Sequence, residues 1–179
     1  MLTDLVSAVS KAGRITAEDV LAFRKAYYHD GRITPVEADA IFTANTACKE
    51  AHPSWSVFFS EALCDYTVHQ MQPHGHVNAD NAAWLMSHID RDGRVDSATE
   101  LDLLVAILEQ AKTVPETLAA YALAQVKHAV ISGTGPLRSG KTLLAGVVDE
   151  ADVELLRRIL FAYAGGGNIA VTSAEADVL

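Results

Sequence analysis

Four carboxylates lie close together in the middle of the chain and could hold a divalent cation. Carboxylate oxygens are the ligands that Ca²⁺ and Mg²⁺ prefer, and a glycine among them lets the loop turn sharply around an ion. The residues Asp90, Asp92, Asp96 and Glu100 surround Gly93 in this way. Their spacing therefore predicts a divalent-cation site, with Ca²⁺ or Mg²⁺ as the ion.

The same spacing predicts that such a site is weak. An EF-hand loop has a glycine at its sixth position, which Gly93 fills. Asp90, Asp92 and Asp96 then fall at positions three, five and nine. A histidine and a threonine occupy positions one and twelve, and Glu100 comes one residue late. Two arginines also lie within the loop, so the alternative is a loop that only shapes the chain. Such a ligand set predicts a dissociation constant no tighter than about 10⁻⁴–10⁻³ M.

A second stretch matches a phosphate-binding motif. Residues 135–142 read Gly-Pro-Leu-Arg-Ser-Gly-Lys-Thr and fit G-x-x-x-x-G-K-[ST]. In a P-loop, Lys141 would contact the outer phosphate and Thr142 would bind Mg²⁺. That loop must follow a strand of a parallel sheet, whereas the preceding residues have helical spacing. We therefore favour a connector at residues 133–145, and a P-loop nucleotide-binding protein is the alternative function.

Glycine and proline residues recur along the chain with a fixed offset. The pairs Gly13 and Gly75, Gly31 and Gly93, and Pro53 and Pro115 are each 62 residues apart. Such a period indicates a duplicated structural unit. We expect one helical domain over residues 1–179, with complete repeats at 13–74 and 75–135 and a partial third repeat at 146–179.

Each repeat contains loops with one local pattern, Gly-x-[Ile/Val], followed by a helix-capping residue. The glycine permits the positive φ that ends a helix, and the β-branched residue suits an extended backbone at which neighbouring loops can pair. An acid or amide three residues after the cap completes a capping box. The predicted cap pairs are Thr16 with Asp19, Thr34 with Glu37, Asn78 with Asn81, and Asp149 with Asp152.

Between these loops, apolar residues recur with the spacing of amphipathic helices, and no stretch alternates as a strand would. The predicted fold is all-α, an antiparallel array of helices. The helices are expected near residues 17–28, 35–51, 54–71, 79–89, 97–112, 115–132 and 150–163, with a last one beginning near Thr172.

The loop sequences also resemble a known family. His29-Asp30-Gly31-Arg32-Ile33 followed by Glu37, and Asp92-Gly93-Arg94-Val95 followed by Glu100, resemble the Asp-Gly-x-[Ile/Val]…Glu signature of the tellurite-resistance TerB-like helical proteins. Those proteins look like distant relatives of EF-hand arrangements. The resemblance covers both full repeats. It implies an all-helical fold and a metal-linked role in stress, and it brings no catalytic residues.

Composition limits the partners and the compartment. The net charge of −9 argues against nucleic acid or an anionic membrane surface as the main partner. No stretch has the roughly 18 apolar residues of a membrane span, and the first residues lack the basic region of a signal peptide. Cys48 and Cys64 are predicted to be buried thiols. We expect a cytoplasmic protein.

Two further features concern metals and partners. His69, His74 and His76 gather near one loop and could hold a transition metal, although solvated histidines explain them as well. The third repeat stops short, and Val178 and Leu179 would leave apolar side chains uncovered. We expect either a shortened form of a longer protein or a C-terminal turn that docks into another subunit.

These observations together predict a non-enzymatic, cytoplasmic, TerB-like or EF-hand-like binding or scaffold protein. Weak divalent-cation binding and a stress-related role belong to this prediction. Its expected partner is a protein or a second copy, bound through the C-terminal region, with no nucleic acid and no membrane.

Overall fold

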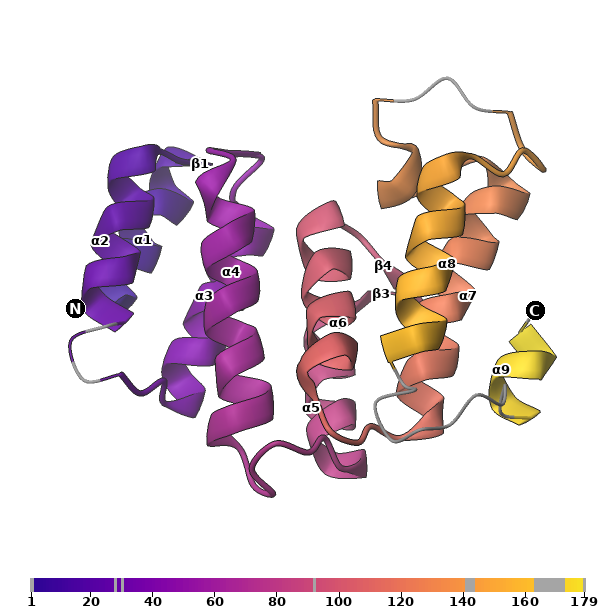
Figure 1. Ribbon diagram of the computed structural model, residues 1–179. Helices are drawn as coiled ribbons and strands as arrows, with labels where there is room; N and C mark the ends of the chain where they lie inside the picture. The colour runs from indigo at the N-terminus through magenta and orange to yellow at the C-terminus, as the bar shows by residue number, and fades with distance from the viewer. Residues whose placement is uncertain are drawn as a thin grey trace. The chain divides into compact units, whose positions relative to one another are not determined.

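A computed structural model of the chain describes residues 2–27, 29, 31–91, 93–140, 144–162 and 173–178. Helices dominate these residues, so the predicted helical fold class is confirmed at this level. The chain clusters into two compact units, Met1–Tyr66 and Thr67–Leu179 (Figure 1). Each unit is described by itself, and the single domain over 1–179 stays a prediction.

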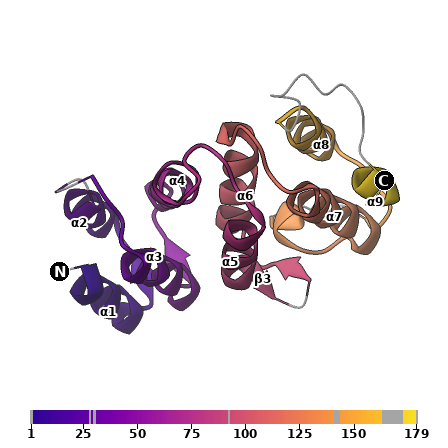
Figure 2. The same ribbon diagram turned by 90° about the horizontal axis from the view of Figure 1, so that it is seen from below.

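The first unit is a bundle of four helices. In chain order, its elements are α1 (Leu2–Ala12), β1 (Arg14–Ile15), α2 (Ala17–Tyr27), α3 (Pro35–Ala47), β2 (Glu50–Ala51) and α4 (Ser54–Cys64). Helix α1 packs against α2 and α3, and α2 packs against α4 (Figure 2). A π-helical stretch, η1 (Asp65–Gln70), continues α4 across the boundary between the units.

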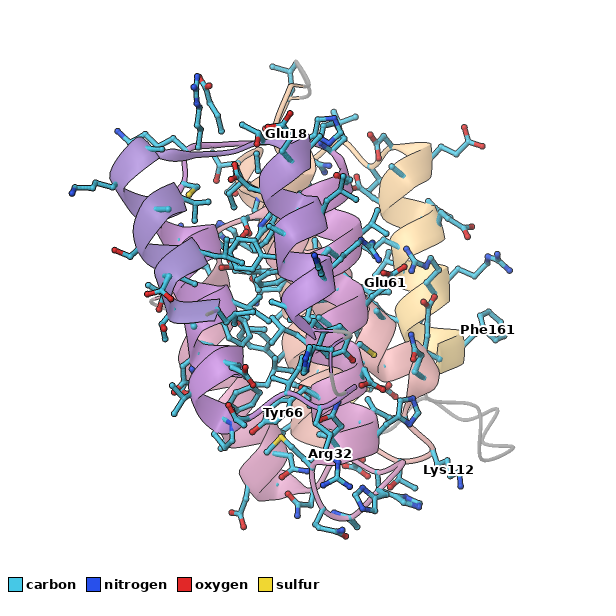
Figure 3. The ribbon with its side chains drawn as sticks, turned by 90° about the vertical axis from the view of Figure 1, so that its left-hand side faces the viewer. Glu18, Arg32, Glu61, Tyr66, Lys112 and Phe161 are labelled. Atoms are coloured by element: carbon cyan, nitrogen blue, oxygen red, sulfur yellow. The ribbon has the colours of Figure 1, made fainter. Side chains whose placement is uncertain are left out.

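Aromatic side chains fill the core of the first unit (Figure 3). The rings of Phe23 on α2 and Trp55 on α4 meet edge to face, with centroids 5.2 Å apart. The rings of Phe42 on α3 and Phe59 on α4 make a second such contact at 5.4 Å. Edge-to-face pairs of this kind add about 0.5–1.5 kcal/mol to the effect of burial. The predicted apolar stripe of α4 is therefore a core stripe.

The second unit contains the remaining elements. They are α5 (Ala79–Ile89), β3 (Asp90–Arg91), β4 (Arg94–Val95), α6 (Ala98–Gln110), α7 (Glu116–Ser132), the 3₁₀ turn η2 (Pro136–Arg138), α8 (Glu150–Ala162) and α9 (Ser173–Val178). Helix α8 packs against α6 and α7, and α9 also packs against α7 (Figure 2). The last helix therefore docks within its own chain, where the sequence indicated another subunit.

Helix α1 is absent from the helices expected from sequence. Its buried residues Leu2, Val6 and Val9 do have helical spacing, which would have predicted it. Helix α3 ends at Ala47 and not near residue 51, because the chain turns extended at Cys48 and pairs with β1 as strand β2.

Short strand pairs replace the expected absence of strands. Strand β1 pairs in parallel with β2, joining Arg14 to Glu50, and β3 pairs antiparallel with β4. Among the described residues, the Gly13 loop thus pairs with the segment before α4 and not with the Gly31 loop. In the second unit, His76 makes a parallel bridge to Thr113 at the corresponding place.

The local turn and cap predictions are confirmed where the residues are described. Thr16 with Asp19 and Asp149 with Asp152 are reciprocal pairs of side chain and backbone N–H, and Thr34 with Glu37 is a full capping box. Asn78 accepts from the Asn81 N–H. The backbone φ of Gly93 is +81°, the left-handed region that glycine adopts without strain.

Candidate functional site

The acidic loop lies between α5 and α6. Asp90 ends α5, and its own N–H donates to the carbonyl of Met86. The chain then forms the β3–β4 hairpin, in which Asp90 pairs with Val95. Ser97 starts α6 as its N-cap. Local backbone terms, a helix end, a glycine turn and a helix cap, therefore place the acidic residues along one short loop.

Three of the four predicted ligands are described, and they differ in exposure. Asp90 is half-buried, and its Oδ1 is buried with no hydrogen-bond partner among the described residues. Asp96 is exposed to solvent. Glu100 is buried, at 5% exposure. Asp92 lies outside the described residues.

Glu100 has a structural role that its sequence position did not predict. It is the third residue of α6, and its Oε2 accepts from the Ser97 N–H at 3.2 Å. The Ser97 Oγ accepts from the Glu100 N–H in return, also at 3.2 Å. This capping box satisfies two backbone donors at the start of the helix. Glu100 therefore already uses one carboxylate oxygen within the chain.

Tyr121 of α7 brings the three carboxylates to a common point. Its hydroxyl is buried without a hydrogen-bond partner among the described residues. The pKa of Tyr121 is raised above its ordinary value, first by burial and then by the negative charges of Asp90, Glu100 and Asp96. Side chains from α5, α6 and α7 thus meet around one phenol.

Gln125, one turn further along α7, holds the hairpin in place. Its Oε1 accepts from the Val95 N–H at 3.0 Å, and its Nε2 donates to the Gly93 carbonyl at 3.3 Å. The side chain is buried, at 6% exposure, so these bonds are shielded from water. Tyr121 and Gln125 are polar residues four positions apart in an apolar helix, and this spacing was the available signal for both.

The other metal candidate is not assembled in the described part of the chain. The His76 ring Nδ1 is 2.8 Å from the Thr113 hydroxyl, and the His74 ring Nε2 is 2.6 Å from the Gln72 amide nitrogen. No set of three His, Cys, Asp or Glu side chains with the geometry of a metal site occurs within the described ranges. The histidines are engaged in loop hydrogen bonds.

The P-loop-like stretch takes a different local structure. Helix α7 runs to Ser132, where a P-loop would need a strand, and a 3₁₀ turn covers Pro136–Arg138. Arg138 donates to both carboxylate oxygens of Asp152 at 2.7 Å. Lys141 and Thr142 lie outside the described residues.

The Arg138–Asp152 pair ties the connector to α8. The two side chains are 3% and 0% exposed, and Arg138 also donates to the Val147 carbonyl at 3.3 Å. Hydrogen bonding to Asp152 raises the pKa of Arg138, so the guanidinium remains charged. Both charges are thus satisfied within the fold, which is the arrangement that a buried ion pair requires.

Two hollows lie beside the acidic loop. One has a volume of about 170 Å³ and extends from Arg94 to His128, and the other has about 520 Å³ and extends from Ser97 to Ser139. Asp96 lines both. Water and small ions can therefore reach this carboxylate from the connector side.

Comparison with known proteins adds no relative to this geometry. No protein-family model, curated protein or solved structure matches the chain. Among the described helices, none has both the length and the apolar character needed to cross a membrane. The function is therefore argued from the site itself.

Proposed function

We propose that the chain is a non-enzymatic, cytoplasmic binding or scaffold protein that binds a divalent cation weakly at the Gly93 loop. Asp90, Asp92, Asp96 and Glu100 are the proposed ligands. The observation that carries the cation proposal is the buried Asp90 Oδ1, which has no hydrogen-bond partner among the described residues. A bound cation, or water held by it, would satisfy this oxygen.

Electrostatics supports the same proposal. A buried acceptor without a partner costs about 1–3 kcal/mol, and Asp90 shares its surroundings with the charges of Asp96 and Glu100. A cation removes both penalties. Since the capping box occupies one Glu100 oxygen, few ligands remain, and we expect a dissociation constant of about 10⁻⁴–10⁻³ M. An irregular set of this kind favours Ca²⁺, because Mg²⁺ requires near-octahedral geometry.

We also propose that the scaffold arose by duplication of a three-helix unit with EF-hand-like Gly-x-[Ile/Val] loops. Helices α2 and α5 begin 62 residues apart, as do α4 and α7, and α3 and α6 begin 63 residues apart. The bridge from His76 to Thr113 matches the pairing of Arg14 with Glu50 under the same offsets. The TerB-like resemblance and a stress-related role remain part of this proposal.

The cytoplasmic part of the proposal has modest chemical support. Cys48 and Cys64 are both free thiols. Thiols persist where the surroundings are reducing, as in the cytosol, and become oxidised more readily outside it. A cytoplasmic scaffold is consistent with two unpaired cysteines.

A cation titration tests the proposal. We expect CaCl₂ to shift the backbone amide resonances of residues 90–100 with a midpoint of about 10⁻⁴–10⁻³ M, and MgCl₂ to do so at higher concentration. Asp90→Asn and Asp96→Asn should each weaken binding at least tenfold. Glu18→Gln removes an exposed acid of α2 and is the matched control, because it should leave the midpoint unchanged. Amide shifts that do not respond to either salt would refute the cation site.

A second titration addresses the non-enzymatic part. We expect no saturable binding of Mg-ATP at micromolar concentration. Binding that is abolished by Lys141→Ala would replace the scaffold with a nucleotide-binding protein. The result is independent of the Ca²⁺ titration, so each part of the proposal can fail alone.

A further inference from the structure

The second unit exposes several large aliphatic side chains within a short stretch of chain. Ile131 lies at the end of α7, Leu144, Val147 and Val148 lie in the connector, and Val153 lies in the first turn of α8. Their exposures are 63%, 77%, 41%, 53% and 56% in that order. We call these five residues the connector patch.

Hydrogen bonds and close contacts place the members of the connector patch side by side. The Gly146 N–H donates to the Val130 carbonyl at 2.7 Å, which brings the connector against the last turn of α7. A Cβ added to Gly133 would lie 3.1 Å from the Ala145 nitrogen, so the two backbones are in contact there. The patch therefore covers the end of the second unit at which α7 stops and α8 begins (Figure 1).

The first unit offers a comparison. Its exposed large aliphatic residues, Leu21, Val36 and Val57, lie singly on three different helices. Isolated residues of this kind are normal on a protein surface. Phe161 is another single case, and it projects from α8 into solvent (Figure 3). A group of five is different, because contiguous exposed apolar surface marks interaction sites.

The rim of the connector patch is acidic. Residues 144–154 contain four acids and no Lys or Arg. Asp152 is paired with the buried Arg138, and Glu154 is paired with Arg157 at 3.0 Å. Asp149 and Glu150 remain at the start of α8, where their neighbours in sequence, Val148 and Val153, are exposed. A partner that covers the patch therefore meets negative charge beside apolar surface.

We propose that the connector patch docks a basic amphipathic segment of a partner protein. Apolar side chains of that segment cover Leu144, Val147 and Val148, and its Lys or Arg side chains lie against Asp149 and Glu150. A second copy of the chain would bring the same acids together, and an anionic membrane would be repelled by them. The inference rests on the proposed binding role and specifies the class of partner.

Two synthetic peptides of about 18 residues, long enough to form a helix, test the proposal. One carries Leu and Lys at helical spacing, and the other carries Leu and Glu at the same positions. Fluorescence anisotropy should show saturable binding of the Lys peptide alone. Raising the salt concentration should weaken it, because the charges are exposed.

Variants locate the binding surface. Leu144→Ser and Ile131→Ser should each weaken binding of the Lys peptide at least fivefold, and Glu150→Lys should do the same through charge. Leu21→Ser is the matched control, because it replaces an equally exposed leucine of the first unit. Circular dichroism confirms that each variant is folded; the surface positions make this the expected result.

Several outcomes would overturn the proposal. They are equal affinity for both peptides, no binding of either, or the same loss with Leu21→Ser as with Leu144→Ser. A dimer that Leu144→Ser dissociates would assign the patch to a second copy, and binding to anionic lipid vesicles lost in that variant would assign it to a membrane. Leu144→Ser should still bind Ca²⁺, so this inference and the cation site fail separately.

Discussion

The chemistry of Arg138 depends on what its neighbours leave available. In a phosphate-binding loop, a basic side chain at this place would be free to approach an anion. Here both terminal nitrogens are bonded to Asp152, and Asp152 also accepts from the Asp149 N–H at 2.9 Å. The residue is therefore a structural fastener between the connector and α8.

Loss of the Arg138 charge should destabilise the protein. Arg138→Met leaves the Asp152 carboxylate buried without its partner, and we expect a loss of about 3 kcal/mol in the free energy of unfolding. This is the lower end of the range for a broken buried pair, because the pair lies at the ends of the helices. Urea unfolding followed by circular dichroism measures it.

A second variant and a control separate charge from packing. Arg138→Met combined with Asp152→Asn should regain part of the stability, since no buried charge is left unpaired. Arg157→Ala breaks the exposed pair with Glu154 and should leave the urea midpoint unchanged. If Arg138→Met unfolds at the midpoint of the parent protein, the ion pair has no structural role.

Cys48 provides a pH-dependent prediction at the same scale. Its thiol is half-buried, and its Sγ donates to the Val9 carbonyl at 3.4 Å. Burial, and then the charge of Asp19, raises the pKa of Cys48 above its ordinary value of 9.0. Only the thiolate reacts with alkylating agents, so reaction is slow at neutral pH and accelerates only above pH 9.

The measurement is the rate of iodoacetamide labelling of the folded protein between pH 7 and pH 10, with glutathione as the unperturbed reference. The midpoint for Cys48 should lie above that of glutathione. Cys64 is 1% exposed and should not react, so Cys48→Ala should abolish labelling. A midpoint at or below that of glutathione contradicts the effect of burial.

At the scale of elements, the caps decide where helices begin. Thr34 and Ser97 each form a capping box with a glutamate three residues later. The box at Ser97 lies one residue later than the offset of 62 places it, where Asp96 would be the equivalent of Thr34. The shift converts Glu100 from a loop ligand position into a helix residue, which weakens the proposed cation site.

Ser97→Ala should lower the free energy of unfolding by about 1 kcal/mol, because the N-cap acceptor for the Glu100 N–H is lost. Ser87→Ala is the matched control. Its hydroxyl donates to the Trp84 carbonyl within α5, which is already engaged in the helix, and the change should be within about 0.5 kcal/mol. Equal effects for the two variants would show that the cap is not important for stability.

At the scale of the whole molecule, α9 completes the second unit. A helix of six residues is not stable alone, so packing on α7 must hold it. Glu175 is 2% exposed, and the Lys127 Nζ donates to the Val178 carbonyl at 2.5 Å. The apolar end of the chain thus has a partner inside the same unit.

Deletion of residues 173–179 should lower the thermal midpoint and increase the binding of a hydrophobic dye, because part of α7 becomes exposed. Lys127→Ala removes only the contact to the Val178 carbonyl and should have a smaller effect. Differential scanning calorimetry and dye fluorescence measure both. A deletion variant with an unchanged midpoint contradicts the docking of α9 on α7.

The local features of this protein were largely predictable from sequence. The helix starts at Ala17, Pro35, Ser54 and Ala79 match the predicted ranges, and the cap pairs follow. These features depend on side chains three or four residues apart and on glycine turns, so their causes lie next to one another in the chain. Helix α1 was missed although Leu2, Val6 and Val9 carry the same signal.

Tertiary structure alone decided the partners of Tyr121, Gln125 and Arg138. Gln125 bonds to a residue 30 positions away, and Arg138 to one 14 positions away. Such contacts depend on how α7 and α8 pack against the hairpin and the connector, and no spacing in the sequence encodes that packing. The acidic loop could therefore be located from its residues, whereas the burial of Asp90 and the use of Glu100 as a cap required the folded chain.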